Sequence, residues 1–199
     1  EPLGRYSRFF DEFCPVFSSL LARLPEIQRD ETVLVEVASD ADVLTAFRYL
    51  AAPPISEDDL KTLADSRLSP ARLRQNPDEA RRVRDIVLHI IDPYRFPWIR
   101  EHRSPSEHEV DRAIIASAAL LAARKVETSR RSKLKKTQEG QVKSLLESSG
   151  FEESPRREMP MLADAPQPGQ YCLESKLGPT RADMIVTLRD RRVMAIECV

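Results

Sequence analysis

The sequence predicts a protein of the α+β or α/β class, in which a helical N-terminal region is followed by a mixed β-sheet core. Apolar residues recur at spacings of three and four up to about residue 150, as in Phe9, Phe13 and Phe17. After residue 170 the spacing of apolar residues changes from that of a helix to that of a strand. Residues 181–188 and 192–199 are short runs rich in Val, Ile and Met, which is typical of strands.

Start and stop signals place the expected helices after the first apolar stripe. Helices are predicted from Ser39, from Ser56, across residues 77–91, from Ser104 and across residues 137–148. Ser39 and Ser56 are each followed three residues later by Asp, the spacing of an N-cap and its partner. Ser104 would cap a helix with Pro at its first position and Glu at its third. Gly150 suits the C-terminal cap of the last helix.

These elements divide the chain into two expected parts. Residues 1–132 form a mainly helical region that is a candidate for DNA binding. Residues 133–199 form the start of a second core, with a helix, a Pro-rich loop at residues 150–170 and a β-hairpin. Because the first residue is Glu1 rather than Met, we expect both ends to be incompletely represented, and the second core to be incomplete at its C-terminus.

The composition indicates a folded, soluble protein without a membrane segment. Hydrophobic residues make up 41% of the chain and charged residues 32%, and no apolar run approaches the roughly 20 residues of a membrane helix. No signal peptide is evident. The three cysteines are scattered and lack the spacing of a zinc or disulfide framework. We therefore expect reduced thiols and a cytoplasmic location.

The charge is distributed unevenly along the chain, although the net charge is only -1. A basic window follows residue 120, and its cations are candidates for contact with the DNA phosphate backbone. They are Arg130, Arg131, Lys133, Lys135 and Lys136. The alternative interpretation is that this window is simply a solvated helix face.

The two predicted strands bring together two acidic residues. A three-residue loop at residues 189–191 would pair Leu188 with Arg192, so that paired residue numbers sum to 380 and Asp183 lies opposite Glu197. Opposed side chains on antiparallel strands share a face, and two carboxylates that close repel unless a cation lies between them. Oxygen ligands of this kind suit Mg²⁺. The apolar character of both strands also predicts a sheet covered on both faces. Alternatively, each acid merely begins or ends a strand at a solvated edge.

The hairpin resembles the signature of the PD-(D/E)xK nuclease superfamily, which has an Asp at the start of one strand and Glu-x-Lys near the end of the next. Other segments are similar to the XamI-type type II restriction endonucleases. They are PPISEDDLKTLA (53–64), YRFPWI (94–99), SPSEHEVDRAI (104–114) and TSRRSKLKKTQEGQVKSLLESSGF (128–151). The resemblance implies a PD-(D/E)xK restriction-endonuclease-like core and a site-specific, Mg²⁺-dependent deoxyribonuclease of a restriction-modification system. It also implies double-stranded DNA as substrate and a homodimer that cuts both strands.

The resemblance assigns roles residue by residue. Asp183 and Glu197 would bind the metal, and the catalytic lysine would stand at position 199, where this sequence has Val199. Three explanations for the missing lysine are open: a substitution at position 199, a truncation of the chain, or a gap in the sequence. Each implies that the chain with Val199 is inactive or nearly so. Glu139 would be an additional catalytic acid, or else an ordinary helix-surface residue. Glu174 is a weaker candidate for a third acid.

Two further functional classes remain open. Val199 favours a catalytically inactive, helical DNA-binding or regulatory protein with a degenerate nuclease core. The near-zero net charge is the one feature that favours a protein-interaction module without a nucleic-acid role. The sequence does not identify the recognition site, because groove placement decides base contacts.

Overall fold

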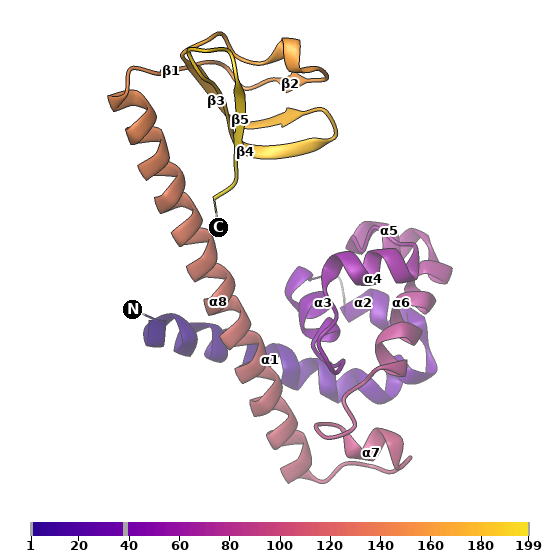
Figure 1. The fold of residues 1–199 in the computed structure, drawn as a ribbon. Coiled ribbons are helices and arrows are strands. Elements are labelled where there is room, and N and C mark those ends of the chain that lie inside the picture. The colour runs from indigo at the N-terminus through magenta and orange to yellow at the C-terminus, as the bar shows by residue number, and fades with distance from the viewer. Residues whose placement is uncertain (1, 38–39, 199) are drawn as a thin grey trace. The chain divides into compact units, whose positions relative to one another are not determined.

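The chain has a helical first part and a sheet in its last part, which makes it an α+β fold (Figure 1). The computed structural model describes residues 2–37 and 40–198. The helices of the first part are α1 (Pro2–Arg29), α2 (Glu31–Val37), α3 (Ala41–Arg48), α4 (Glu57–Ala64), α5 (Pro70–Gln75), α6 (Pro77–His89), α7 (Pro97–Arg100) and α8 (Glu107–Ser148). They are followed by β1 (Glu152–Glu153), β2 (Glu158–Met159), the 3₁₀ helix η1 (Leu162–Asp164), β3 (Gln170–Leu177), β4 (Thr180–Thr187) and β5 (Val193–Ile196).

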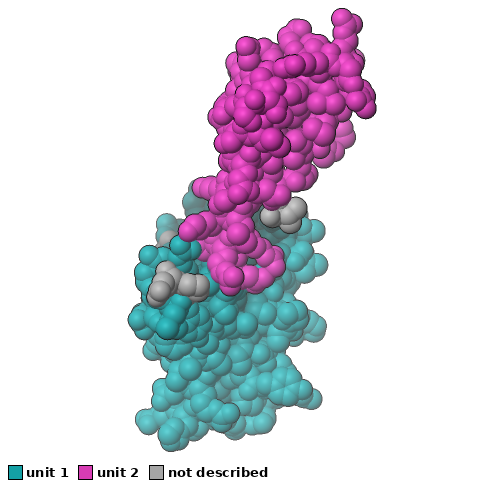
Figure 2. Space-filling model, turned by 60° about the vertical axis from the view of Figure 1, so that its left-hand side comes forward, with its two compact units in different colours: residues 1–126 teal, residues 127–199 magenta. Residues whose placement is uncertain are grey.

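Residue contacts divide the chain into two compact units, residues 1–126 and 127–199 (Figure 2). The division falls inside α8, so this helix contributes its first part to one unit and its second part to the other. The roles expected for residues 1–132 and 133–199 stay predictions. No helix in the described part of the chain combines the length and the apolar character that a membrane crossing requires.

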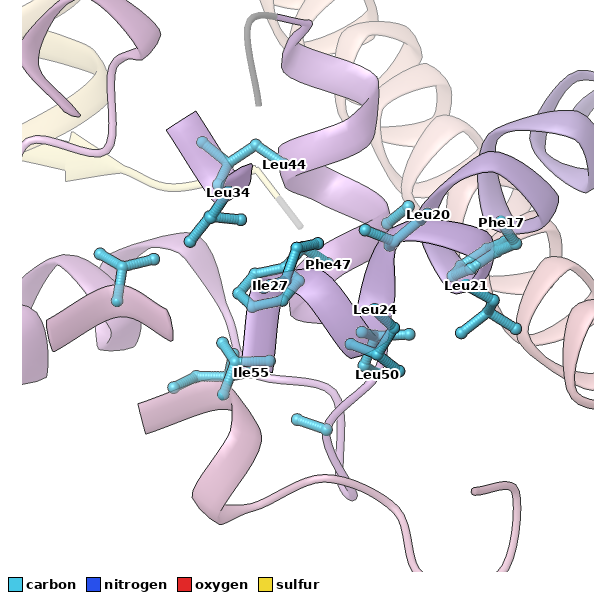
Figure 3. Close-up of a cluster of buried hydrophobic side chains, with 14 of the residues drawn as sticks. Phe17, Leu20, Leu21, Leu24, Ile27, Leu34, Leu44, Phe47, Leu50 and Ile55 are labelled. Carbon is cyan, nitrogen blue, oxygen red and sulfur yellow. The ribbon is translucent and has the colours of Figure 1, made fainter. Parts of the chain in front are cut away.

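The first unit is built around the apolar stripe of α1, as the sequence predicted. Phe13, Phe17 and Leu20 are fully buried. Figure 3 shows α1 side chains gathered with Leu34 of α2 and Phe47 of α3 in one cluster. Leu34 also explains why α2, which the sequence did not reveal, is helical. Its ETVLVEV sequence is rich in β-branched residues, so burial of Leu34 in the cluster overrides a weak helix propensity.

The predicted helix starts at Ser39 and Ser56 have different outcomes. Ser56 caps α4 as predicted, because its Oγ accepts a hydrogen bond of 3.0 Å from the amide of Asp59. Ser39 lies outside the described residues, and the N-cap of α3 is Asp40. The Asp40 carboxylate accepts a hydrogen bond of 2.8 Å from the amide of Asp42. An Asp side chain serves as well as Ser at an N-cap, which explains the displaced start.

The start of α8 also differs from the prediction. The cap is Ser106 rather than Ser104. Ser106 Oγ accepts a hydrogen bond of 3.3 Å from the amide of Glu109, and the Glu109 carboxylate accepts one of 2.8 Å from the amide of Ser106. This reciprocal pair is a capping box, which requires an acid three residues after the cap. Glu109 fits that spacing for Ser106, so the box fixes the helix start.

Helix α8 continues through the basic window without a break. The prediction of a separate helix at residues 137–148 is therefore wrong. A single helix of 42 residues runs through this region. From Glu107 to Gln138 it contains no Gly or Pro and is rich in good helix formers. An ion pair of 2.5 Å between Glu127 and Arg131, one turn apart, adds support. The predicted end is confirmed, because Gly150 adopts a left-handed φ of 77° directly after the helix.

The second unit contains a mixed sheet in which β3 is central. The strand order is β1-β3-β4-β5, and β2 also pairs with β3. β1 and β2 run parallel to β3, whereas β4 and β5 are antiparallel additions (Figure 1). The expectation of a loop at residues 150–170 is therefore wrong where β1 and β2 form. β3 was missed because Glu174, Ser175 and Lys176 interrupt its apolar pattern, although Gly169 and Gly178 mark its two ends.

The predicted register of the β4–β5 hairpin is confirmed. Thr187 pairs with Val193 and Met184 pairs with Ile196, so the residue numbers sum to 380. β4 is covered as expected, since Met184 is fully buried. The same expectation is wrong for β5. Within the described residues β5 pairs with β4 alone, and Met194 is 40% exposed.

Two leucines of α4 provide a test of the first unit's core. Leu60 is 0% exposed, whereas Leu63, one turn away, is 64% exposed. Replacing Leu60 by Ala should lower the free energy of unfolding by about 2–5 kcal/mol, because it leaves a cavity in the cluster. The matched change Leu63→Ala should stay within about 0.5 kcal/mol. Urea denaturation of both variants measures the difference, and equal effects would contradict the assigned packing.

Candidate metal centre

Asp183 and Glu197 meet where the β4–β5 register continues past the end of β5. Asp183 lies on β4, and its side chain is 14% exposed. Its Oδ2 accepts a hydrogen bond of 2.8 Å from the amide of Cys198. The side chain of Glu197 also interacts with Asp183 and contributes to lowering its pKa. The two acids that the hairpin spacing predicted to be neighbours are thus brought together.

A lysine of α8 lies against this pair. Lys135 Nζ is 2.7 Å from Asp183 Oδ1, and the lysine side chain remains 42% exposed. The hydrogen bond to Asp183 raises the pKa of Lys135, and the negative charges of Asp183, Glu139 and Glu197 raise it further. We call Glu139, Asp183 and Glu197 the carboxylate cluster. Lys135, which the sequence suggested as a phosphate contact, faces the carboxylate cluster here.

The same negative charges affect the pKa of the Cys198 thiol. Burial raises the pKa of Cys198, and the charges of Asp183, Glu139 and Glu197 raise it further. Asp183 itself behaves differently. Burial acts to raise its pKa, but the hydrogen bonds from Lys135 and from the Cys198 amide outweigh burial, so the pKa lies below the ordinary value of 3.8. Asp183 is therefore a carboxylate at neutral pH.

The two carboxylates of Asp183 and Glu197 fit a hard cation such as Mg²⁺. Within the residues that the structure describes, no group of three or more His, Cys, Asp or Glu side chains is placed so that it could hold a metal ion. Mg²⁺ does not require one, because it retains several waters and is commonly held by one or two carboxylates together with a substrate phosphate. Asp183 and Glu197 could supply those two carboxylates. Glu139 is close enough to act on the same ammonium group, Lys135.

A pocket of about 340 Å³ opens beside Asp183. Its lining combines α8 with β3 and β4, and consists of Lys136, Glu139, Gly140, Lys143, Arg156, Leu173, Glu174, Asp183 and Met184. Gly140 lies within α8, where Gly is less favourable than Ala by about 1 kcal/mol. No atom lies within 4 Å of the position that a Cβ would take there. Internal packing therefore does not require this glycine, which leaves the helix backbone open to the pocket.

The other cations of the predicted DNA-binding set are spread around α8. Arg130, Arg131, Lys133 and Lys136 are all exposed. Successive helix residues are turned by about 100°, so these side chains do not form one stripe. Val199 lies outside the described residues, and the structure gives no account of it.

Glu174, the weaker candidate for a third acid, pairs with a basic residue. Its carboxylate lies 2.9 Å from Arg156 in an ion pair. Its backbone is left-handed, with φ of 43°, at the position in β3 that lies opposite Asp183. The pairs on either side, Leu173 with Met184 and Ser175 with Ala182, establish that register.

A second set of basic residues was missed by the sequence analysis. Arg156, Arg157, Lys176 and Arg181 line a pocket of about 530 Å³ in the second unit. We call these four residues the hairpin cations. This pocket shares Arg156 and Glu174 with the pocket beside Asp183. Gly178 and Pro179 signal a turn that would have placed Lys176 opposite Arg181, if β3 had been recognised as a strand.

Comparison with known proteins identifies the family of the chain. The family described as XamI restriction endonuclease has a sequence model that matches residues 29–199. The chain belongs to the XamI restriction endonuclease family. It is 43% identical over 154 residues to the Type II restriction enzyme XamI of Xanthomonas campestris pv. amaranthicola, a match that covers 77% of this chain. That match spans about half of the relative, 56% of its length. No solved structure matches the chain.

Membership of the XamI restriction endonuclease family confirms the resemblance that the segments outside the hairpin suggested. The matched region includes α8 and the whole sheet, and therefore every member of the carboxylate cluster. It also includes position 199, where the sequence has Val. The assignment of individual residues to catalysis stays a prediction.

The lowered pKa of Asp183 predicts a pH dependence of stability. Because the folded-state pKa lies below 3.8, the carboxylate stabilises the fold fully above that value, and this contribution disappears as pH falls through the folded pKa. Compared with the wild type, Asp183→Asn should therefore lose less stability between about pH 6 and about pH 3. Urea unfolding of both proteins at the two pH values measures this. The exposed acid Glu152 provides a control, since Glu152→Gln should retain the wild-type dependence.

Proposed function

We propose that the chain carries the metal-binding part of a site-specific endonuclease that hydrolyses double-stranded DNA with Mg²⁺. The observation that carries this proposal is the convergence of Asp183 and Glu197 at the end of the β4–β5 hairpin, with Glu139 and Lys135 beside them. Its support is membership of a restriction endonuclease family and the name of a relative, a type II restriction enzyme. The proposed core is of the PD-(D/E)xK type, and the proposed assembly is a homodimer.

Each residue of the site has a proposed task. Asp183 and Glu197 would hold Mg²⁺, which supplies an activated water and neutralises charge on the scissile phosphate. The amide of Cys198 orients Asp183 by donating a hydrogen bond of 2.8 Å to Oδ2. Glu139 would add a carboxylate from α8. The pocket bounded by Gly140 would receive the cleaved strand, because the exposed helix backbone permits close approach.

Position 199 determines whether this site is active. A lysine two residues after Glu197 would orient the attacking water or stabilise charge in the transition state. Valine can do neither. We therefore propose that the chain with Val199 cleaves DNA poorly or not at all, and that lysine at this position restores cleavage.

Cleavage by the full-length protein tests the proposal. The Val199→Lys protein with Mg²⁺ should convert a supercoiled plasmid into discrete fragments. Adding Asp183→Asn or Glu197→Gln should lower the cleavage rate by about 100-fold or more, because each change removes a proposed metal ligand. Glu152→Gln, which neutralises an exposed acid of β1, is the matched control and should leave the rate unchanged. Equal cleavage by the Asp183→Asn and Glu152→Gln proteins would contradict the proposal.

A second function is favoured by Val199 alone. In this alternative the chain binds DNA without cutting it, and the degenerate nuclease core serves only to stabilise the fold. Salt-dependent DNA binding with no cleavage, even after lysine is placed at position 199, would support this function over the enzyme.

The hairpin cations supply a proposed DNA-backbone contact in the second unit. Lys176 and Arg181 are directly opposed across β3 and β4. Like charges in such a pair are destabilising, although Glu158 of β2, which pairs with Lys176 on its other side, offsets part of the repulsion. A phosphate would relieve the part that remains. Through Arg156 the same surface is continuous with the pocket beside Asp183, which places the proposed contact next to the proposed site of cutting.

Neutralising Lys176 or Arg181 should affect DNA binding and the stability of the folded protein differently. Lys176→Gln and Arg181→Gln should each lower the slope of log K against log salt concentration by up to about 0.9, the value for one phosphate contact. Arg181→Gln should also be more stable by about 0.2–1 kcal/mol, because it removes the cross-strand repulsion. Lys176→Gln should gain less, because it also removes the attraction between Lys176 and Glu158. Arg191→Gln, an equal charge change in the β4–β5 turn, is the control. An unchanged salt slope in all three variants would exclude DNA contact by these hairpin cations.

A further inference from the structure

Lys135 of α8 forms an ion pair with Asp183 of the carboxylate cluster. Its ammonium group lies 2.7 Å from Asp183 Oδ1, and the charges of Glu139 and Glu197 act on the same group. Carboxylates whose charges act on one ammonium group also repel one another. The single positive charge of Lys135 thus compensates only part of the negative charge of the three acids. It does so at the position where the proposed function requires a divalent ion.

Both oxygens of Asp183 already have a donor. Oδ1 interacts with Lys135, and Oδ2 accepts the hydrogen bond from the amide of Cys198. An ammonium group and a divalent cation that share one carboxylate oxygen would repel strongly at such short range. The neutral Cys198 amide does not conflict with a metal ion in this way, because each carboxylate oxygen has a second lone pair. The charged ammonium of Lys135 is the donor that a nearby divalent cation would repel.

Lys135 is the donor that can move. The Cys198 amide belongs to the backbone that follows β5, whereas the lysine has a flexible four-carbon side chain. The lysine side chain is 42% exposed, compared with 14% for Asp183. Solvent reaches the lysine side of this ion pair, and water screens such pairs, so that their contribution to the free energy is modest. A divalent ion, with twice the charge, would interact more strongly with the carboxylate cluster.

We propose that Lys135 is an internal substitute for the divalent cation. In the metal-free protein the Lys135 ammonium group compensates the negative charge of the carboxylate cluster. When the metal ion binds, the ammonium group moves away from Asp183. The inference rests on the proposed function, in which Asp183 is a metal ligand. In this inference Lys135 stabilises the metal-free site and competes with the metal ion for Asp183.

Titration with Mg²⁺ alone, in the absence of DNA, tests this inference on the full-length protein. Lys135→Gln should tighten Mg²⁺ binding by about two- to fivefold in isothermal titration calorimetry, because the competing cation is gone. Lys136→Gln is the matched control. It removes the same charge from the next residue of α8, which lines the pocket, whereas the ion pair with Asp183 is made by Lys135. It should therefore change Mg²⁺ affinity much less than Lys135→Gln.

The possible outcomes separate this inference from the proposed function. Weaker Mg²⁺ binding by Lys135→Gln, or equal effects of the two lysine variants, would overturn the role of Lys135 while leaving the metal site in place. Absence of Mg²⁺ binding by the wild type, or binding that survives Asp183→Asn, would overturn the metal site and this inference together. Displacement has its own readout, since Mg²⁺ should shift the side-chain NMR signals of Lys135 and leave those of Lys136 nearly unchanged.

Discussion

The register between β4 and β5 is the constraint on which the whole candidate site depends. A slip of one residue would turn every side chain of β5, and the acid that follows it, to the other face of the sheet. The turn resists such a slip, because the amide of Leu188 donates a hydrogen bond of 2.8 Å to the carbonyl of Arg192. Burial of Met184 and Val186 on one face of β4 adds to this resistance. Once the register is fixed, Asp183 can be reached from the backbone after β5 and from α8.

The parts of the fold that were predictable are those with a local physical signal. The α1 stripe, the Ser56 cap and the Gly150 cap each depend on residues a few positions apart. The continuity of α8 was not predictable from apolar periodicity, because its basic stretch is exposed and has no apolar face to follow. β3 was missed for a different reason. Its polar second half is a strand because β2 and β4 pair with it, and that pairing depends on segments distant in sequence.

The same distinction applies to the site. Asp183 and Glu197 belong to one hairpin, so a turn length and a pairing rule were enough to bring them together. The position of Lys135 depends on how α8 packs against the sheet. That packing comes from a cluster in which Val142 and Leu146 of α8 contact Tyr171 and Met184. The sequence indicated that Lys135 was basic and helical, and membership of the basic window suggested a phosphate contact. Only the packing of helix on sheet shows that it faces three acids.

The backbone at Glu174 has a consequence for the kind of ion this centre can accept. In a regular strand Glu174 would stand beside Asp183, and with Glu197 it would complete a row of acids across three strands. The left-handed φ of 43° and the ion pair with Arg156 divert it from that row. In the proposed metal site, fewer protein oxygens would leave more of the coordination sphere to water. That would favour a small, strongly hydrated octahedral ion over Ca²⁺, which takes six to eight oxygen ligands in a flexible shell. One distorted residue would thereby contribute to ionic selectivity without touching the ion.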